Sequence, residues 1–391
     1  MENNTDKIYF PGLNGLRFVA ASAVIVTHIE LLKQQVGLPS LWDEKKHPFF
    51  FNAGGLGVYF FFVLSGFLIT YLLMSEKKKD GKISIWNFYM RRVFRIWPVY
   101  YLLIILAFFV FPHFDILKLD YFDKFLPEYF GVKLLFYLLL LPNLALAMFY
   151  SVPHAGQAWS IGVEEQFYIL WPWIVRKSKN VLRTIIYLGI GIVIFKTAVL
   201  FICNFFPDHA WLQTFKAFVA MTKIECMAIG GFGACVSFGN YKKWKEIIFK
   251  PIVQLISYAM LPILIFLTPP VLQDGEHLIY SFCFLVIIMN VALNSKSFLK
   301  LENKIFNLLG NISYGMYMFH MFIVVLVLRS VPSFIDVNNI LLVNVAYYGL
   351  SFGLTIGFCI LSYYFYEKPF IKLKKKFTSI VSGPDALKKS L

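Results

Sequence analysis

Eleven apolar stretches, each about long enough to cross a lipid bilayer, occupy most of this 391-residue chain. They lie at 15–32, 56–74, 97–112, 132–149, 160–175, 182–203, 213–238, 249–268, 278–293, 305–329 and 339–366. Because 59% of the residues are hydrophobic and 19% are aromatic, a soluble globular core is excluded. We therefore predict an all-α fold, a polytopic integral membrane helix bundle.

The basic residues indicate how these stretches cross the membrane. The chain has a net charge of +15, and its lysines and arginines cluster in the connections between apolar stretches. This is the positive-inside pattern of membrane proteins, which argues against a nucleic-acid partner. The basic clusters lie at 77–95, 176–183, 242–250, 296–304 and 368–376. With a cytoplasmic amino terminus, all of them face the cytoplasm only if 132–149, which Pro142-Asn143 interrupts, fails to cross. We predict about ten crossings, one re-entrant or broken helix over 132–149, and both termini cytoplasmic.

The rest of the chain indicates a single domain. We expect a membrane domain over 1–376 and a short cytoplasmic tail over 377–391, polar enough to be disordered. The five cysteines fall within apolar stretches and show no paired spacing. They predict neither a disulfide framework nor a metal site.

The first apolar stretch carries two ionisable residues. Arg17 and His28 are eleven residues apart, which puts their side chains within about 20° of the same helical face and roughly 16 Å apart along the axis. Inserting an arginine at the bilayer centre costs about 2.5–3.5 kcal/mol of free energy. Because such residues avoid lipid, a second polar group on the same helical face indicates that both side chains point into a shared cavity. The alternative is an interfacial arginine anchor with a structural histidine.

A second histidine, His320, also lies inside an apolar stretch, whereas the other five fall in connections that we place outside. Ser313, Tyr317 and His320 follow one another at i, i+4 and i+7 and share a helical face. An intramembrane histidine can act as a base near neutral pH. A structural hydrogen bond within the bundle explains His320 equally well.

The stretch 54–70 combines three glycines at its start with Ser65-Gly66 inside an aromatic segment. Close helix packing explains the glycines. Ser65 is a conceivable nucleophile, although no base stands near it in the sequence.

Three arginines, Arg91, Arg92 and Arg95, stand at the cytoplasmic entrance of the third apolar stretch. Their planar guanidinium groups suit polyphosphate, because each can bind two oxygens at once. Anchoring to anionic lipid headgroups is the alternative. Because no lysine accompanies them, we favour phosphate binding.

Two carboxylates, Glu164 and Glu165, lie one turn beyond Ser160 at the outer end of the fifth stretch. Ser160 is a plausible helix cap, and Glu164 a partner for the positive helix end. Two carboxylates so far inside an aromatic segment exceed what capping requires. A catalytic or histidine-orienting carboxylate is the better interpretation.

Taken together, these motifs resemble the membrane-bound acyltransferase-3 family of bacterial O-acyltransferases. The resemblance covers about residues 10 to 370, in the expected order. The matching segments are Arg17 with His28, GGLGVYFFFVLSGFL, RRVFRIWP, WSIGVEEQF, GNISYGMYMFH, which contains Tyr314 and Tyr317, and YEKP.

The resemblance implies an enzyme of the bacterial cytoplasmic membrane. Members of that family move an acyl group, often acetyl, from cytoplasmic acyl-CoA to a sugar hydroxyl. It implies acyl-CoA, first of all acetyl-CoA, as donor co-substrate, no metal, and a glycan or lipid-linked sugar as acceptor, with membrane lipids around the protein. Some members carry an extracytoplasmic hydrolase-like domain, which we do not expect here. A homo-oligomer and a separate extracytoplasmic partner both stay open.

A mechanism follows as a hypothesis. Arg91, Arg92 and Arg95 hold the donor phosphates at the inner face, with Arg17 at the mouth of a channel that the pantetheine arm enters. His28 then acts as a general base or carries the acyl group transiently, oriented by Glu164 or Glu165.

Two other classes of protein fit the same residues. A transporter or flippase also places arginine and histidine inside a bundle, but no inverted repeat is visible. An acyl exporter that works with a separate transferase is the other alternative.

Overall fold

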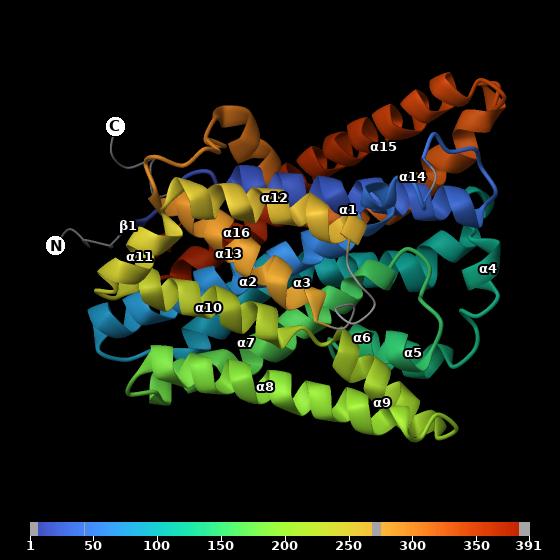
Figure 1. The fold of residues 1–391 in the computed structure, drawn as a ribbon. Helices are drawn as coiled ribbons and strands as arrows, with labels where there is room; N and C mark the ends of the chain where they lie inside the picture. The colour runs from blue at the N-terminus through green and yellow to red at the C-terminus, as the bar shows by residue number, and fades with distance from the viewer. Residues whose placement is uncertain (1–6, 43, 268–274, 383–391) are drawn as a thin grey trace.

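The computed structural model describes residues 7–42, 44–267 and 275–382, which form a bundle of long helices that run side by side (Figure 1). The helices are α1 (Leu13–Gln35), α2 (Pro48–Asp80), α3 (Ile85–Ile105), α4 (Asp120–Asp123), α5 (Phe130–Leu138), α6 (Pro142–Met148), α7 (Trp159–Lys177), α8 (Val181–Asn204), α9 (Ala210–Met221), α10 (Ile224–Phe238), α11 (Lys242–Ile248), α12 (Pro251–Leu267), α13 (Glu276–Leu293), α14 (Lys304–Ser330), α15 (Ile340–Ser362) and α16 (Lys368–Lys374). The strands β1 (Lys7–Ile8) and β2 (Val381–Ser382) pair in parallel. The π-helical turns η1 (Leu106–Val110) and η7 (Tyr363–Glu367) extend α3 and α15.

The number of membrane-spanning helices agrees with a polytopic bundle. Within the described residues, eight helical segments are long and apolar enough to cross a membrane, and α11 with α12, bent by 55°, makes a ninth. α7 is 19 residues long and packs against α2 and α3, but its two glutamates and its basic end make it more polar than these nine. The predicted all-α membrane fold is confirmed, with eight or nine candidate spans among the described residues against about ten expected crossings. A tenth crossing by α7 stays a prediction.

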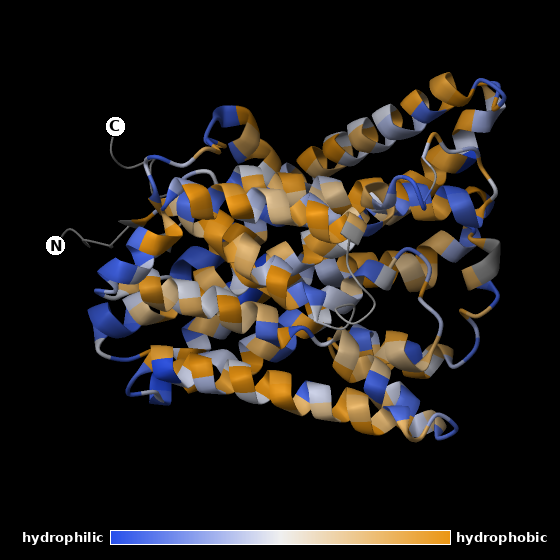
Figure 2. Ribbon diagram, in the orientation of Figure 1, coloured by the Kyte–Doolittle hydropathy of each residue, from blue (hydrophilic) through white to orange (hydrophobic). Residues whose placement is uncertain are grey.

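The centre of the bundle consists of α1, α2, α10 and α14, whose backbones approach closely at glycines. Gly66 of α2 lies against the backbone of Met227, and Gly230 of α10 lies against the backbone of Val63. Lipid tails are as apolar as the side chains, so the hydrophobic effect does not hold these helices together within the membrane. Van der Waals contact between closely packed backbones stabilises the bundle instead. α8 lies at the edge of the bundle, largely hydrophobic and exposed (Figure 2). All five cysteines are buried and unpaired, as predicted.

The basic clusters lie at the end of the bundle where the two described chain ends meet in the β1–β2 pair (Figure 1). Lys77 donates to backbone carbonyls in the last turn of α7 and directly after it, and Lys79 donates to the carbonyl of Ser379. Glu302, between α13 and α14, accepts a hydrogen bond from the backbone of Gly12. This shared end is what the positive-inside pattern requires, and its cytoplasmic location stays a prediction.

The segment 132–149 does not form one crossing helix. α5 has 9 residues and α6 has 7, each too short to span a bilayer, and the chain breaks between them at Leu140, whose φ is 59°. Tyr100 donates to the carbonyl of Tyr137, so this break is packed against α3. The described part of the tail predicted over 377–391 includes β2, and 383–391 lie outside the described residues, as does 268, the end of another predicted stretch.

His154, in the connection between α6 and α7, predicts how acid destabilises this part of the protein. Burial lowers the pKa of His154 to about 4, although the carbonyl of Leu117, 2.7 Å from its Nε2, favours the protonated ring. The unfolded chain takes up this proton near pH 6.5, so the folded state loses stability as the pH falls from about 6.5 to about 4, by on the order of 3 kcal/mol at most.

We expect His154→Gln to flatten this pH dependence, because glutamine keeps a donor for Leu117 and does not titrate. The measurement is the thermal unfolding midpoint in detergent between pH 7.5 and 4.5. His209→Gln, at an exposed position, is the control and should retain the wild-type pH profile. Parallel curves for wild type and His154→Gln would contradict the assignment.

Candidate active site

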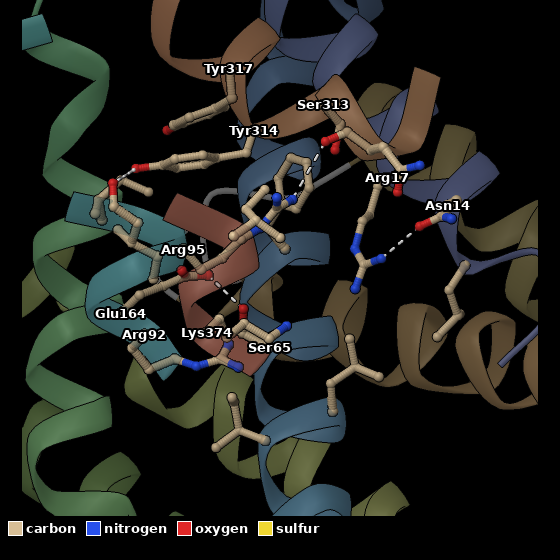
Figure 3. A pocket seen from close by; sticks show the side chains of 18 of the residues that line it. Asn14, Arg17, Ser65, Arg92, Arg95, Glu164, Ser313, Tyr314, Tyr317 and Lys374 are labelled. Carbon is tan, nitrogen blue, oxygen red and sulfur yellow. Dashed lines mark hydrogen bonds between the residues drawn. The ribbon is translucent and has the colours of Figure 1, made fainter. Parts of the chain in front are cut away.

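A cavity of about 680 Å³ lies between α1, α2, α3, α7, α14 and the C-terminal segment. Figure 3 shows its polar side chains converging from these different elements. Eight of the twelve candidate residues predicted from the sequence line it, together with Ser313. They are Arg17, Ser65, Arg92, Arg95, Ser160, Glu164, Tyr314 and Tyr317.

The three arginines that line the cavity have no carboxylate partner within 4.0 Å among the described residues. Arg17 donates to the side chain of Asn14 at 2.8 Å, and Arg95 donates weakly to a backbone carbonyl. Arg92 lies over the rings of Phe88 and Tyr168. With Glu164 as the carboxylate among the predicted residues that line the cavity, the three guanidinium groups leave an excess of positive charge there, so this cluster is suited to bind a phosphate group.

Arg91 does not line this cavity with the other arginines. Its guanidinium lies 2.7 Å from the carboxylate of Glu76 and also donates to the carbonyl of Phe377. α3 turns Arg91 away from Arg95 toward α2, which the sequence spacing of one turn did not reveal. Arg91 was expected among the phosphate ligands, but it lies outside the cavity lining. It instead links α3 to the C-terminal segment through the carbonyl of Phe377.

The two glutamates of α7 point to different surroundings. Glu164 lines the cavity and accepts hydrogen bonds from Ser65 at 2.6 Å and from Tyr168 at 3.0 Å. Glu165 is 6% exposed, lies outside the cavity lining and accepts from the indole of Trp97. Adjacent residues on a helix differ by about 100° in direction, so only one can face the cavity. The sequence showed no base near Ser65, but the fold brings the carboxylate of Glu164 within hydrogen-bond distance of its hydroxyl.

His28 and His320 form a pair across α1 and α14. Nε2 of His320 lies 3.2 Å from Nδ1 of His28, and the ring centroids are 4.9 Å apart. Nδ1 of each ring faces the carbonyl four residues earlier, of Val24 and of Met316. Because a carbonyl only accepts, this network assigns the proton to both Nδ1 atoms, and His320 Nε2 accepts from His28. A neutral His28 then keeps its lone pair on Nε2, as a base requires.

Among the described residues, neither glutamate makes a hydrogen bond to either histidine. The side-chain hydrogen bonds of these four residues are the ones given above. The orientation of His28, which we expected from Glu164 or Glu165, comes instead from His320 and the backbone of α1. Glu164 instead accepts hydrogen bonds from Ser65 and Tyr168 at the cavity wall.

Tyr317 marks the boundary between the cavity and the histidines. Its hydroxyl lies 2.6 Å from Ser160 and donates to the carbonyl of Gln157. Its ring packs against Phe61 and lies 6.2 Å from the ring of His320. Tyr317 lines the cavity whereas neither histidine does, so the shared cavity expected for Arg17 and His28 is found for Arg17 alone.

A buried charge cluster away from the cavity was missed by the sequence analysis. Lys196 of α8 and His277 of α13 lie 2.6 and 2.7 Å from the same oxygen of Glu225 on α10. His277, which we placed in an outer connection, lies in the first turn of α13. Lys196 inside an apolar stretch is the signal that should have pointed to it. The cluster ties α8 to the bundle.

The different surroundings of the two glutamates predict different mutant effects. We expect Glu164→Gln to lower turnover by at least about 10-fold, because it removes a charge that Ser65 and Tyr168 hold at the cavity wall. Glu165→Gln keeps an acceptor for Trp97 and should stay near the wild-type rate. Acyl transfer per amount of folded protein is the measurement, and equal losses in both variants would contradict the distinction.

Comparison with known proteins identifies the family. Residues 10–364 match the model of a family described as an acyltransferase domain. The chain is 25% identical over 329 residues to the peptidoglycan O-acetyltransferase OatA of Listeria monocytogenes, covering 80% of this chain and 49% of that protein. It is 28% identical over 359 residues to the O-acetyltransferase OatA of Staphylococcus aureus, covering 85% and 54%.

This chain thus spans about half the length of these curated relatives. No solved structure matches it. The matched residues include the three cavity arginines, Glu164, Tyr317 and both histidines of the pair. Because the family model matches most of its length and the chain folds into membrane-spanning helices that carry these groups, this chain belongs to the acyltransferase-3 family of multi-pass membrane acyltransferases.

Proposed function

We propose that this chain transfers an acetyl group from acetyl-CoA to a hydroxyl of a cell-surface or lipid-linked glycan. The observation that carries this proposal is the position of three arginines without carboxylate partners in a cavity that ends beside a hydrogen-bonded histidine pair. The name of the Listeria relative gives peptidoglycan as the acceptor of that protein, which supports a glycan acceptor here.

The cavity fits the donor in size and in chemistry. Its volume of about 680 Å³ lies within the range of about 300–1,000 Å³ that small-molecule sites occupy. Arg17, Arg92 and Arg95 would hold the diphosphate, because guanidinium groups bind phosphate oxygens in pairs. Leu68 and Ile69 give the cavity apolar walls for the pantetheine arm. The thioester then points toward Tyr317, and the donor enters from the end that carries the basic clusters.

His28 would act as the general base once the acyl group has passed Tyr317. Its Nε2 takes the proton of the acceptor hydroxyl while the hydroxyl oxygen attacks the thioester carbon. A C–O bond forms, the C–S bond breaks, and the leaving thiolate takes up the proton. His320 keeps the proton of His28 on Nδ1 throughout. If His28 instead carried the acyl group, labelled acetyl would remain on the protein in the absence of acceptor.

The test incubates the purified full chain with labelled acetyl-CoA and peptidoglycan fragments or lipid-linked sugars. Label on the glycan together with release of free CoA is the expected result. An unconsumed thioester would overturn the proposal in favour of a transporter. Consumption that occurs only when a separate extracytoplasmic protein is added would make this chain an acyl exporter.

A further inference from the structure

The segment after α15 folds back across the mouth of the cavity. The π-helical turn η7 ends α15, and α16 then packs against α3. Arg91 donates to the carbonyl of Phe377 at 2.8 Å, and the ring of Phe377 stacks on Phe94. Lys79 donates to the carbonyl of Ser379, and β2 pairs with β1. Contacts from α2, α3 and the N-terminal strand therefore fix where the side chains of α16 lie.

Four lysines of this segment line the cavity together with the arginines. They are Lys368, Lys372, Lys374 and Lys375. Lys374 is half-buried and appears beside Arg92 in Figure 3. The other three lysines are exposed at the rim of the cavity. The family model matches residues 10–364, so all four lie beyond the segment that it matches, although Lys368 belongs to the YEKP segment noted in the sequence. A cavity that already holds three arginines has in addition a lysine-lined mouth.

We propose that these lysines bind the 3′-phosphate of the CoA donor, an inference that rests on the proposed function. The thioester end points toward Tyr317 and the diphosphate lies at the arginines, so the adenosine end with its 3′-phosphate lies at the mouth. A phosphate monoester carries about −1.5 to −2 charges at pH 7 and is free to rotate. Flexible, point-like ammonium groups suit such a group, whereas the arginine forks suit the diphosphate.

Anionic lipid headgroups offer the same phosphate chemistry, and lysines at the inner face of a membrane often bind them. The position of these lysines favours the donor, because they line the same cavity as Arg92 and Arg95. Lys376, the next residue along the chain, is exposed and does not line the cavity. It provides a control that differs in position and not in charge.

The experiment compares the binding of CoA and of dephospho-CoA, which lacks only the 3′-phosphate, to the full chain in nanodiscs. We expect wild type to bind CoA at least about 10-fold more tightly than dephospho-CoA. The variant Lys372→Gln/Lys375→Gln should lose most of this preference through weaker CoA binding, with dephospho-CoA affinity unchanged. Lys82→Gln/Lys376→Gln removes the same charge from the same end of the bundle and should keep the preference.

Equal affinities of wild type for the two nucleotides would overturn the inference, as would equal losses for both nucleotides in the double variant. Nanodiscs of neutral lipid and of lipid containing phosphatidylglycerol separate the two phosphate sources. An effect of the double variant that requires phosphatidylglycerol and leaves the CoA preference intact would assign the lysines to lipid and refute the proposal. Because binding is measured without acceptor, a chain that discriminates the nucleotides yet acetylates no glycan refutes only the proposed function.

Discussion

Replacing His28 with alanine is expected to lower acetyl transfer by about 10²- to 10⁴-fold, the contribution that a general base typically makes. His28 is the member of the histidine pair whose Nε2 keeps a lone pair in the hydrogen-bond network. Because His28 does not line the cavity, the variant should still bind CoA. The measurements are the initial rate of glycan labelling and the affinity for CoA, both per amount of folded protein.

His320→Ala tests the support that the partner histidine provides. It should lower the rate less than His28→Ala, because the carbonyl of Val24 still holds the proton of His28 on Nδ1. His209→Ala, at an exposed position between α8 and α9, is the control for loss of an imidazole and should leave the rate unchanged. A near-normal rate in His28→Ala would remove this residue from the reaction.

Gly66→Ala and Gly230→Ala are each expected to destabilise the fold by about 3 kcal/mol or more, at or above the upper end of overpacking effects. A Cβ at Gly66 would lie 1.9 Å from the carbonyl oxygen of Met227, and one at Gly230 would lie 1.9 Å from that of Val63. The clash is with backbone, so no side-chain rotation relieves it, and α2 and α10 must separate. The measurement is the fraction of monodisperse protein that survives heating in detergent.

Gly349→Ala is the matched control for these two variants. Gly349 lies in α15, and a Cβ there meets nothing within 4 Å. Alanine favours helix over glycine by up to about 1 kcal/mol, so this variant should be as stable as wild type or more stable. If all three variants behaved alike, the close approach of α2 and α10 would not be a source of stability.

Properties that depend on short stretches of sequence were predictable. Ser313, Tyr317 and His320 were expected on one face, and within the continuous α14 the first two line the cavity while His320 is fully buried beyond it. The break in 132–149 was predicted from Pro142-Asn143 and from the parity of the basic clusters, and it lies at Leu140. In each case the cause is local: helical periodicity, a turn-forming residue, or a charge that stays out of lipid.

The sequence by itself determined that this chain forms apolar helices, where they begin and end along most of its length, and that arginine, glutamate and histidine lie within them. Only the tertiary structure decided that Arg92 and Glu164 face the cavity while Arg91 and Glu165 do not. It alone paired His28 with His320, 292 residues away, and brought the lysines of α16 to the mouth of the cavity. The physical reason is that hydropathy and helical periodicity act within one helix, whereas the rotation of a helix and its neighbours depend on close packing between segments distant in sequence.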